Sequence, residues 1–511
     1  MTQALHRLLQ QQPDSVAAVD VRETLTRRAF IDRVARIAGA LRSAGLQPGD
    51  RVAMLARNSV DFYAYIFGTW WAGGVINPVN LRWNASEIAF SLEDCETHIL
   101  IVESVFAHMI PSIREQAPCL SRVMVLGDVE DAGDAGDYRA WVAGADPVED
   151  AVRRGDDLAA ILYTGGTTGR PKGVMLSHNN LAASMLGSML ALRALERSQY
   201  LQTAPLFHIG GMSGMLAGLY TGATHVFLPA FDASAVLTAI DRHRIQELFL
   251  VPSMLRMVVD HPDFQSFDVR SVRRIRYGAS PIDGGLMDRA IAAFPNAGFV
   301  QAYGMTELSP VATMLTEDDH GEAGRASGRL RSAGKAIPTA ELRIVDPEGL
   351  EVPRGMVGEI AVRGPGVMLG YWNRPDATRE AVRDGWMHTG DLGSMDADGY
   401  VTVVDRLKDM IITGGENVYS AEVETALSTH PAVGQAAVIA MPDEKWGERV
   451  HAVIVLRPGC SADPEALTAH CRATIAGFKV PRSYAFVDTL PLSGAGKVLK
   501  NILRDQCRAG N

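Results

Sequence analysis

Short runs of apolar, often β-branched residues alternate with longer segments of helical periodicity through much of this chain. Arg51–Leu55 and His98–Val102 have the composition of buried strands, whereas Phe30–Leu41 and Val60–Trp71 repeat apolar residues at helical spacing. Such alternation is typical of a mainly parallel sheet that helices cover on both faces. We therefore expect an α/β fold in which ligands bind where strands end in turns. The acidic, glycine-containing segment Ala132–Ala145 is expected to be a loop.

The length of the chain and a change in its residue pattern predict more than one domain. A chain of 511 residues exceeds what one hydrophobic core usually serves. Beyond about Gly334, short strands such as Leu342–Val345 are separated by Pro, Gly and Asp, which indicates a small β-barrel or an added antiparallel sheet. The charged run Asp405–Asp409 is expected to be an exposed linker, although a charged hairpin turn inside one domain has the same composition. The prediction is a large N-terminal domain at 1–405, with subdomains at about 1–150, 151–333 and 334–405, a hinge at 406–409, and a small mobile α+β C-terminal domain at 410–511.

Composition narrows the class of protein. The formal net charge of −10 argues against a general nucleic-acid binder, whose footprint is a basic patch or stripe. The five cysteines are scattered and lack CxxC spacing, so neither a disulfide framework nor a zinc site is indicated. With no signal sequence and no apolar stretch long enough to span a bilayer, we expect a cytoplasmic protein without stable membrane insertion.

The run Leu158–Leu162 leads into a stretch with the composition of a phosphate-binding loop. The segment YTGGTTGRPKG contains four glycines, three threonines and two cations. Glycines let backbone N–H groups turn towards one anion, threonine hydroxyls add donors, and Arg170 and Lys172 supply charge. The stretch is not a Walker A loop, because Lys172 is followed by Gly173 rather than Ser or Thr. A glycine-rich surface turn remains the alternative.

Three more segments place functional groups in turns. The turn Tyr303–Glu307 combines an aromatic ring, which can stack on a purine, with a carboxylate suited to Mg²⁺. Asp391 lies in a turn where its carboxylate can accept both hydroxyls of a ribose, and Lys497 lies in a small-residue loop near the C-terminus. Taken singly, Glu307 is better explained as a capping or solvated carboxylate, Asp391 as a turn aspartate and Lys497 as a solvated lysine.

Together these segments resemble the adenylate-forming superfamily, and within it the fatty-acyl-CoA and aryl-CoA ligases of the 4-coumarate and feruloyl type. The resemblance extends along nearly the whole chain and implies an AMP-forming acid–thiol ligase that uses ATP, Mg²⁺ and coenzyme A. A carboxylic acid and ATP would give an acyl-adenylate and pyrophosphate, and CoA would then displace AMP. The matching segments, in the family's order, are YTGGTTGRPKGV, PLFHIGG, YGAS, QAYGMTE, HTGDLG, DRLKDMIITGGENVYSAEVE, PDEKWGE and the terminal GK.

The resemblance also implies roles for single residues. Lys497 would contact the α-phosphate and the substrate carboxylate, Glu307 would bind Mg²⁺, and Lys408 would be the hinge. The turns at Gly278–Ser280 and Tyr303 would enclose adenine. The implied catalytic residues are Lys497, His208, Thr306 and Glu307. The implied nucleotide-binding residues are Thr164, Gly165, Gly166, Thr167, Thr168, Gly169, Lys172, Gly278, Ala279, Ser280, Tyr303, Gly304, Thr306, Asp391 and Arg406.

Coenzyme A and the acyl group would be bound by further segments. Gly414, Gly415 and Trp446 are implied to face CoA, with His208 at the junction between the acyl pocket and the CoA tunnel. The Gly- and Met-rich segment after His208 suggests an apolar channel for a medium-to-long-chain fatty or aryl-alkyl acid, although helix-packing core accounts for it equally well. The implied acyl-pocket residues are His208, Gly210, Gly211, Met212, Gly214, Tyr277, Gly304, Met305, Pro310 and Val311.

Two other hypotheses about function are consistent with the sequence. A stand-alone adenylation enzyme would pass its acyl group to a carrier-protein thiol instead of CoA, and a non-catalytic adenylate-binding protein would keep the fold without the reaction. The joint presence of Glu307, Asp391, Arg406 and Lys497 argues against the second of these. Expected partners are the small-molecule acid, ATP and CoA, with a homodimer as an open alternative to a monomer.

Overall fold

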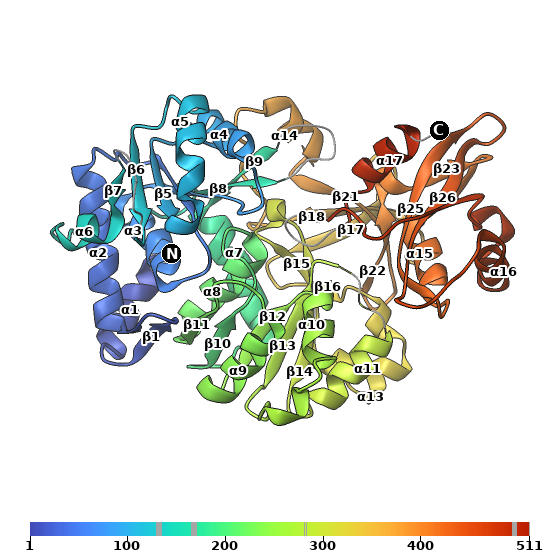
Figure 1. The fold of residues 1–511 in the computed structure, drawn as a ribbon, viewed down its shortest axis with the longest axis horizontal. Coiled ribbons are helices and arrows are strands. Elements are labelled where there is room, and N and C mark those ends of the chain that lie inside the picture. The colour runs from blue at the N-terminus through green and yellow to red at the C-terminus, as the bar shows by residue number, and fades with distance from the viewer. Residues whose placement is uncertain (129–134, 165–170, 281, 283, 493–497, 510–511) are drawn as a thin grey trace. The chain divides into compact units, whose positions relative to one another are not determined.

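The computed structural model describes residues 1–128, 135–164, 171–280, 282, 284–492 and 498–509 (Figure 1). The chain forms two compact units: Met1–Leu342 with Val362–Met387, and Arg343–Ala361 with His388–Asn511. The second unit thus includes two segments that the predicted domain division assigned to the large domain. The hinge at 406–409 stays a prediction, because compactness in one conformation does not locate the point about which a domain turns.

The first unit contains a nine-stranded sheet in the order β16-β15-β14-β13-β12-β10-β11-β1-β2. The six strands from β14 to β1 run parallel, whereas β2, β15 and β16 are antiparallel additions at the edges. The strands are β1 (Val16–Val19), β2 (Thr24–Thr26), β10 (Gln199–Gln202), β11 (Thr224–Phe227), β12 (Glu247–Leu250), β13 (Arg274–Gly278), β14 (Gly298–Gly304), β15 (Val311–Leu315) and β16 (Lys335–Ala336).

An eight-stranded sheet in the same unit has the order β19-β9-β8-β4-β3-β5-β6-β7. The strands from β8 to β7 run parallel, and β9 is antiparallel to both of its neighbours. The two parallel sheets confirm the predicted α/β fold. The strands are β3 (Arg51–Leu55), β4 (Val75–Pro78), β5 (Ile99–Glu103), β6 (Arg122–Leu126), β7 (Gly136–Asp137), β8 (Leu158–Thr164), β9 (Lys172–Ser177) and β19 (Gly370–Tyr371).

Helices cover these sheets, and their bounds are those expected from the apolar periodicity to within a few residues where helices were predicted. The helices of the first unit are α1 (Gln3–Gln11), α2 (Arg27–Ser43), α3 (Val60–Ala72), α4 (Ala85–Asp94), α5 (Ile110–Gln116), α6 (Tyr138–Ala143), α7 (His178–Leu192), α8 (Ile209–Thr221), α9 (Ala233–His243), α10 (Pro252–Val259), α11 (Gly284–Ala293), α12 (Glu317–His320), α13 (Glu322–Ala326) and α14 (Pro375–Ala381).

Helix α3 is buried along its whole length because it packs against both sheets. Trp70 donates its indole N–H to the carbonyl of Ala159 in β8 at 2.8 Å. The ring of Tyr63 lies 5.1 Å from that of His225 and 5.5 Å from that of Phe227, both in β11. Large aromatic side chains contribute much of the apolar area in a protein core, so one helix supplies core to two sheets.

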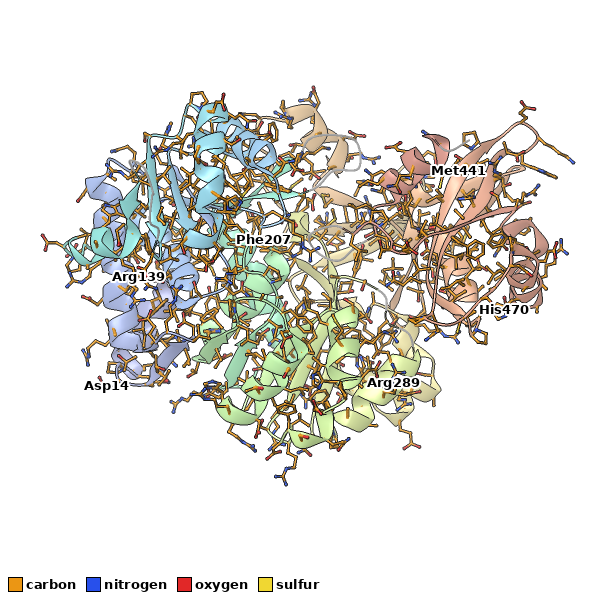
Figure 2. The ribbon with its side chains drawn as sticks, in the orientation of Figure 1. Asp14, Arg139, Phe207, Arg289, Met441 and His470 are labelled. Carbon is orange, nitrogen blue, oxygen red and sulfur yellow. The ribbon has the colours of Figure 1, made fainter. Side chains whose placement is uncertain are left out.

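The outer faces of the sheets have cores of their own. Apolar residues of α4 and α5 pack on β3, β5 and β6, and apolar residues of α9, α10 and α11 pack on β10 to β13. Figure 2 draws the side chains that fill these layers.

The expectation of a loop at Ala132–Ala145 is wrong for its second half. Residues 129–134 lie outside the described residues, but β7 and α6 follow them. Asp137 caps α6 by accepting from the N–H of Ala140, and Tyr138 and Val142 bury one face of the helix. Arg139, labelled in Figure 2, reaches Asp61 of α3 at 2.9 Å. The sequence did not predict α6, because two buried residues in a helix of six are too few to show a helical period beside acidic residues and glycines.

The second unit is built on a sheet in the order β24-β23-β26-β25, with β27 parallel to β26. Its longest strands, β25 (Val433–Asp443) and β26 (Gly447–Leu456), form one hairpin and extend several residues beyond the predicted strands. The remaining elements are β23 (Ile411–Thr413), β24 (Glu416–Val418), α15 (Ser420–Ser428), α16 (Pro464–Thr474), β27 (Ser483–Phe486) and α17 (Lys500–Ala509).

The short strands expected after Gly334 are also present. They are β17 (Glu341–Val345), β18 (Gly358–Arg363) and β22 (Val401–Arg406). The same sheet contains two strands that the sequence did not predict, β20 (Val382–Arg383) and β21 (Trp386–Met395). Among the described residues, no helix is both long enough and apolar enough to cross a membrane.

Helix α8 approaches the nine-stranded sheet closely through its glycines. A Cβ on Gly214 would lie 2.0 Å from the hydroxyl oxygen of Tyr200 in β10, and one on Gly218 would lie 2.6 Å from the ring of His225 in β11. Tyr200 and His225 are themselves fully buried and have little room to move. These contacts favour the helix-packing interpretation for both glycines.

We expect Gly214→Ala to lower the midpoint of thermal unfolding, because overpacking a core costs about 1–3 kcal/mol. Gly284→Ala is the matched control, since its Cβ meets nothing within 4 Å in α11 and Ala stabilises an open helical position by up to about 1 kcal/mol. Differential scanning calorimetry should give shifts of opposite sign for the two variants. An unchanged midpoint for Gly214→Ala would instead indicate free space beside α8.

Candidate active site

The strands that flank the predicted phosphate loop pair antiparallel up to its ends. Thr164, the last residue of β8, lies opposite Lys172, the first residue of β9. Both side chains are half-buried. The structure thus holds the two ends of the loop together. The other predicted phosphate-binding residues, Gly165, Gly166, Thr167, Thr168 and Gly169, lie outside the described residues.

A tyrosine that sequence reasoning missed joins Lys172 to Glu307. The hydroxyl of Tyr371 donates a hydrogen bond to Oε1 of Glu307 at 2.8 Å. The Nζ atom of Lys172 lies 5.0 Å from the centroid of the Tyr371 ring, within range of a cation–π interaction. Burial raises the pKa of the Tyr371 phenol, and the Glu307 carboxylate raises it further. The phenol therefore stays protonated and remains a donor.

Glu307 lies in a one-turn 3₁₀ helix, Thr306–Leu308, that follows β14. The side chains of Thr306 and Glu307 are both buried. The carbonyl of Glu307 accepts from the N–H of Met368 at 2.9 Å, two residues before β19 begins. Backbone and side chain of Glu307 are thus both tied to the segment around β19.

The two turns predicted to enclose adenine leave neighbouring parallel strands. Gly278 at the end of β13 lies opposite Ala302 in β14, so the turn Gly278–Ser280 and the residues Tyr303 and Gly304 share one edge of the sheet. A Cβ on Gly278 would lie 2.3 Å from the carbonyl oxygen of Ala302, which explains why only glycine fits there. The structure therefore brings these predicted residues together at the carboxyl ends of the strands.

His208 is the N-cap of helix α8. Its Nδ1 atom accepts a hydrogen bond from the N–H of Gly210 at 3.1 Å. Because Nδ1 accepts, the neutral ring carries its proton on Nε2. This bond orients the imidazole and accounts for a histidine directly before the glycines.

The other predicted acyl-pocket residues are placed mainly by packing contacts. Met212 is fully buried, and a Cβ on Gly211 would lie 2.3 Å from the carbonyl oxygen of Pro205. Tyr277 is also fully buried, and its hydroxyl lies 2.8 Å from Nε2 of His320. Met305 and Pro310 are half-buried. These contacts are packing contacts, and the acyl-pocket assignment stays a prediction.

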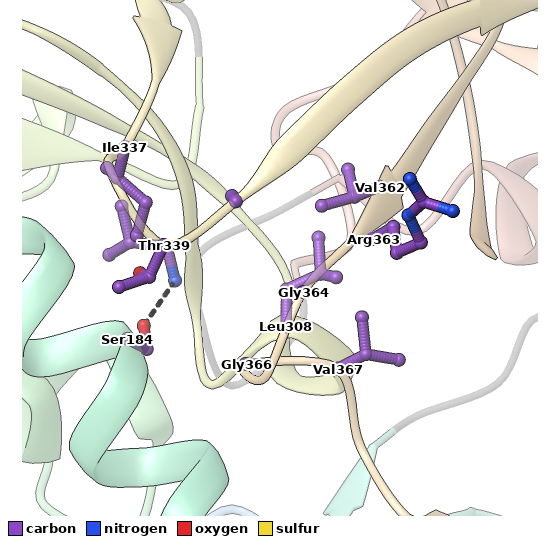
Figure 3. Close-up of a pocket in the computed structure, with 11 residues that line it drawn as sticks. Ser184, Leu308, Ile337, Thr339, Val362, Arg363, Gly364, Gly366 and Val367 are labelled. Carbon is purple, nitrogen blue, oxygen red and sulfur yellow. Dashed lines mark hydrogen bonds between the residues drawn. The ribbon is translucent and has the colours of Figure 1, made fainter. Parts of the chain in front are cut away.

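Val311 lines a small pocket that Figure 3 shows in close-up. Ser184 of α7 accepts from the N–H of Val311 at 3.3 Å, the dashed line in the figure. The cavity volume is about 10 Å³, far below the roughly 300–1,000 Å³ of typical ligand sites. It does not provide room for a long acyl chain.

In the second unit, the two residues implied to bind ribose form an ion pair. Nε of Arg406 lies 2.6 Å from Oδ1 of Asp391, and the two residues face each other across β21 and β22. Asp391 is buried. The hydroxyl of Thr389 accepts from the N–H of Asp391 at 3.1 Å. The expectation that Asp391 lies in a turn is wrong, because Asp391 is inside β21 (Trp386–Met395) and pairs with Arg406 of β22. This strand pairing presents a fixed carboxylate with an arginine beside it.

The expectation of an exposed linker at Asp405–Asp409 is wrong for both aspartates. Asp405 is buried and accepts from the hydroxyl of Ser420 at 2.8 Å, at the start of α15. Asp409 is buried and pairs with Arg504 of α17. Within the run, Leu407 and Lys408 are the exposed residues. Buried carboxylates need partners, and here the partners fix both ends of the run inside the second unit.

The three residues implied to face CoA lie together. The N–H of Gly414 donates to the carbonyl of Trp446 at 2.9 Å, and Gly414 and Gly415 adopt φ values of 62° and 84°. Two cations, which sequence reasoning missed, cover the indole of Trp446. The guanidinium carbon of Arg482 lies 4.2 Å and the Nζ of Lys445 4.8 Å from a Trp446 ring centroid. A cationic aromatic surface of this kind suits a phosphorylated nucleotide.

Lys497 lies outside the described residues, but both flanks of its segment are anchored. Leu492 and Val498 form an antiparallel bridge. Beyond it, Nζ of Lys500 lies 2.6 Å from the hydroxyl of Ser420 and 2.7 Å from Oε1 of Glu424. The chain on each side of the predicted catalytic lysine is thus held to the second unit.

Within the described residues, no group of three or more His, Cys, Asp or Glu side chains converges in a way that holds a metal ion. Mg²⁺ in nucleotide sites usually takes one or two carboxylates and completes its shell with phosphates and water. Glu307, which Tyr371 links to Lys172 at the end of the predicted phosphate loop, can supply such a carboxylate.

Comparisons with known proteins match both parts of the chain. The AMP-binding enzyme family matches residues 5–372, and the AMP-binding enzyme C-terminal domain matches residues 422–497. A feruloyl-CoA synthase of Amycolatopsis is 39% identical over 485 residues, covering 94% of this chain and 93% of its own. A fatty acid–[acyl-carrier-protein] ligase of Streptomyces coeruleorubidus is 37% identical over 506 residues, covering 97% and 94%.

A solved structure shows the same fold. The o-succinylbenzoate CoA synthetase of Bacillus subtilis, in complex with its acyl-adenylate intermediate, superposes with a TM-score of 0.87 at 30% identity and covers 98% of both chains. This chain belongs to the AMP-binding enzymes, the adenylate-forming superfamily that its motifs indicated.

Proposed function

We propose that this protein is an ATP-dependent carboxylic acid–CoA ligase that acts through an acyl-adenylate. The observation that carries the proposal is the row formed by Glu307, Tyr371 and Lys172 at the end of the phosphate loop. It combines a carboxylate suited to Mg²⁺ with a cation suited to phosphate. The Asp391–Arg406 pair, suited to a ribose, and the cationic surface on Trp446, suited to CoA, support the same assignment.

The reaction needs cations because two anions must approach each other. A carboxylate oxygen attacks the α-phosphorus of ATP, a new P–O bond forms, and the bond to the bridging oxygen breaks with departure of pyrophosphate. Lys172, together with the expected Lys497, would offset the charge on the reacting groups. Mg²⁺ held by Glu307 would supply further charge neutralisation on the phosphates.

The second step takes place at the carbonyl carbon of the adenylate. The sulfur of CoA attacks this carbon, the C–O bond to AMP breaks, AMP leaves with the bonding electrons, and the thiol proton is released. The Gly414–Trp446 contact and the cations over the indole would bind CoA, and His208 would lie where acyl group and thiol meet. Rotation of the C-terminal part about Lys408 would exchange the first set of neighbours for the second.

For the acid, we propose a medium-to-long-chain fatty or aryl-alkyl carboxylic acid. Relatives at 37–39% identity are named for ferulic acid and for fatty acids. Between them, these names span the proposed class. The buried glycines of α8 and the small pocket at Val311 give no further support for a long channel in this conformation.

A carrier-protein acceptor is the second candidate, and one observation favours it: a relative that covers nearly the whole chain is named for acyl-carrier-protein ligation. A carrier protein presents the same phosphopantetheine thiol without the CoA nucleotide. The cations on Trp446 favour CoA, because they suit a phosphorylated nucleotide. The cytoplasmic location and the homodimer stay predictions.

The test is a panel of carboxylic acids assayed for AMP release with CoA or with a phosphopantetheinylated carrier protein. We expect acid-dependent AMP release with CoA for fatty or aryl-alkyl acids. Release with the carrier protein alone would establish the second candidate. Absence of ATP–pyrophosphate exchange with every acid would overturn ligase function and leave the non-catalytic adenylate-binding protein.

We expect Lys497→Ala to lower adenylate formation by about 10²-fold or more, because it removes a charge that acts on the transition state. Thioester formation from preformed adenylate should be largely spared. Rapid-quench measurement of each half-reaction checks this. Lys500→Ala is the control, since Nζ of Lys500 bonds Ser420 and Glu424 and its loss should affect stability instead. Equal loss in both half-reactions would contradict the assignment of Lys497.

We expect Lys408→Pro to slow thioester formation more than adenylation, because proline fixes φ and removes a backbone donor at the proposed hinge. Lys408→Ala is the comparison, since it removes the ammonium but keeps the backbone free. The same two half-reaction assays apply. If adenylation falls as far as thioester formation, or if both substitutions act alike, the hinge does not lie at this residue.

A further inference from the structure

The segment Met368–Arg374 ties the predicted phosphate loop to the turn that carries Glu307. Its strand β19 pairs with β9, with Tyr371 opposite Val174. On one side, the N–H of Trp372 donates to the carbonyl of Gly173 at 2.8 Å. On the other, the N–H of Met368 donates to the carbonyl of Glu307 at 2.9 Å. One short segment therefore touches both functional elements through its backbone.

Side chains on this segment anchor it further. The indole N–H of Trp372 donates to the carbonyl of Asp94 at 2.8 Å, and Nη2 of Arg374 lies 2.9 Å from Oδ1 of Asp94. The N–H of Tyr371 donates to the hydroxyl of Thr378 at 2.9 Å. Tyr371 thus projects from a backbone that is fixed on both sides.

The side chain of Tyr371, like the backbone of its segment, contacts both β9 and the turn that carries Glu307. Its hydroxyl bonds Oε1 of Glu307, and its ring faces the ammonium of Lys172. A donor on one carboxylate oxygen restricts rotation of the Glu307 side chain. Hydrogen-bond partners of metal ligands usually matter in this way, since their loss costs about 10–100-fold in metal affinity or activity.

We propose that Tyr371 is a positioning residue that orients the Glu307 carboxylate towards Mg²⁺ and holds the Lys172 ammonium beside it. The inference rests on the proposed function for the identity of the metal and of the nucleotide. It assigns a role to a residue outside the predicted site set. Tyr371 acts through Glu307 and Lys172 and is not expected to touch the reacting atoms.

The variant that tests the hydrogen bond is Tyr371→Phe, which keeps the ring against Lys172. The matched control is Tyr65→Phe, because the Tyr65 hydroxyl donates to the carbonyl of Val52 in β3 at 2.7 Å and neither residue belongs to the predicted site. Each substitution removes one phenol hydrogen bond. The midpoint of thermal unfolding of each variant establishes that it is folded and that the two losses of stability are comparable.

The readout is binding of Mn²⁺, used as a probe for Mg²⁺, to the full chain with ATP and without an acid substrate, measured by electron paramagnetic resonance. For Tyr371→Phe we expect the dissociation constant of Mn²⁺ to rise about 10-fold, with metal-free AMP binding within twofold of wild type. Tyr65→Phe should bind Mn²⁺ as wild type does. A constant within twofold of wild type for Tyr371→Phe, or an equal rise in the control, would overturn the positioning role.

A second variant separates the ring from the hydroxyl. Tyr371→Leu also removes the aromatic ring that faces the Lys172 ammonium. Because Lys172 is then held less firmly, ATP binding in EDTA should weaken for this variant but not for Tyr371→Phe. Equal ATP binding by both would overturn the part of the proposal that concerns Lys172.

The outcomes for Tyr371 and for the ligase reaction are distinguishable. Wild-type protein that binds Mn²⁺ with ATP but shows no acid-dependent pyrophosphate exchange would refute the ligase function, while the ratio of Mn²⁺ constants still decides the role of Tyr371. Wild-type protein that binds no Mn²⁺ with ATP would overturn both the metal assignment and the positioning role.

Discussion

The antiparallel edge β8–β9–β19 determines how charge is arranged in this protein. A chain with a net charge of −10 must keep a local positive site for an anionic nucleotide. Backbone pairing of β9 with both neighbours fixes Lys172 at one end of the predicted phosphate loop and Tyr371 beside it. The Glu307 turn is then attached to β19 through backbone and side chain. Without that edge, the cation and the carboxylate would have no common support.

Much of the fold could be predicted because periodicity and turn residues act locally. The strands and helices of the first unit follow apolar runs whose spacing is set by burial, and α7 begins after Ser177, which with Asn180 forms a capping box. The α6 helix was missed because one buried turn carries too few apolar residues to show a period. The buried state of Asp405 and Asp409 was missed because their partners, Ser420 and Arg504, are remote in sequence.

The sequence could suggest candidate site residues that belong to a motif, but not residues whose proposed role depends only on a contact in the fold. Glycines such as Gly278 stand in turns whose geometry excludes a side chain. Tyr371 gives no such local signal, because its importance comes from Glu307, 64 residues away in the chain. Arg482 is similar, since its proximity to Trp446 depends on the pairing of β26 with β27. The spacing of residues along the chain does not predict such contacts between residues that are distant in sequence.

The complete burial of α3 affects how the first unit can unfold. Tyr63 contributes to packing on β11, while Trp70 bonds β8, so neither sheet possesses a full set of core partners by itself. A truncation that removed either sheet would leave aromatic surface of this helix in water. The unit is therefore expected to melt cooperatively as one body, and neither half is expected to persist as an independent fragment.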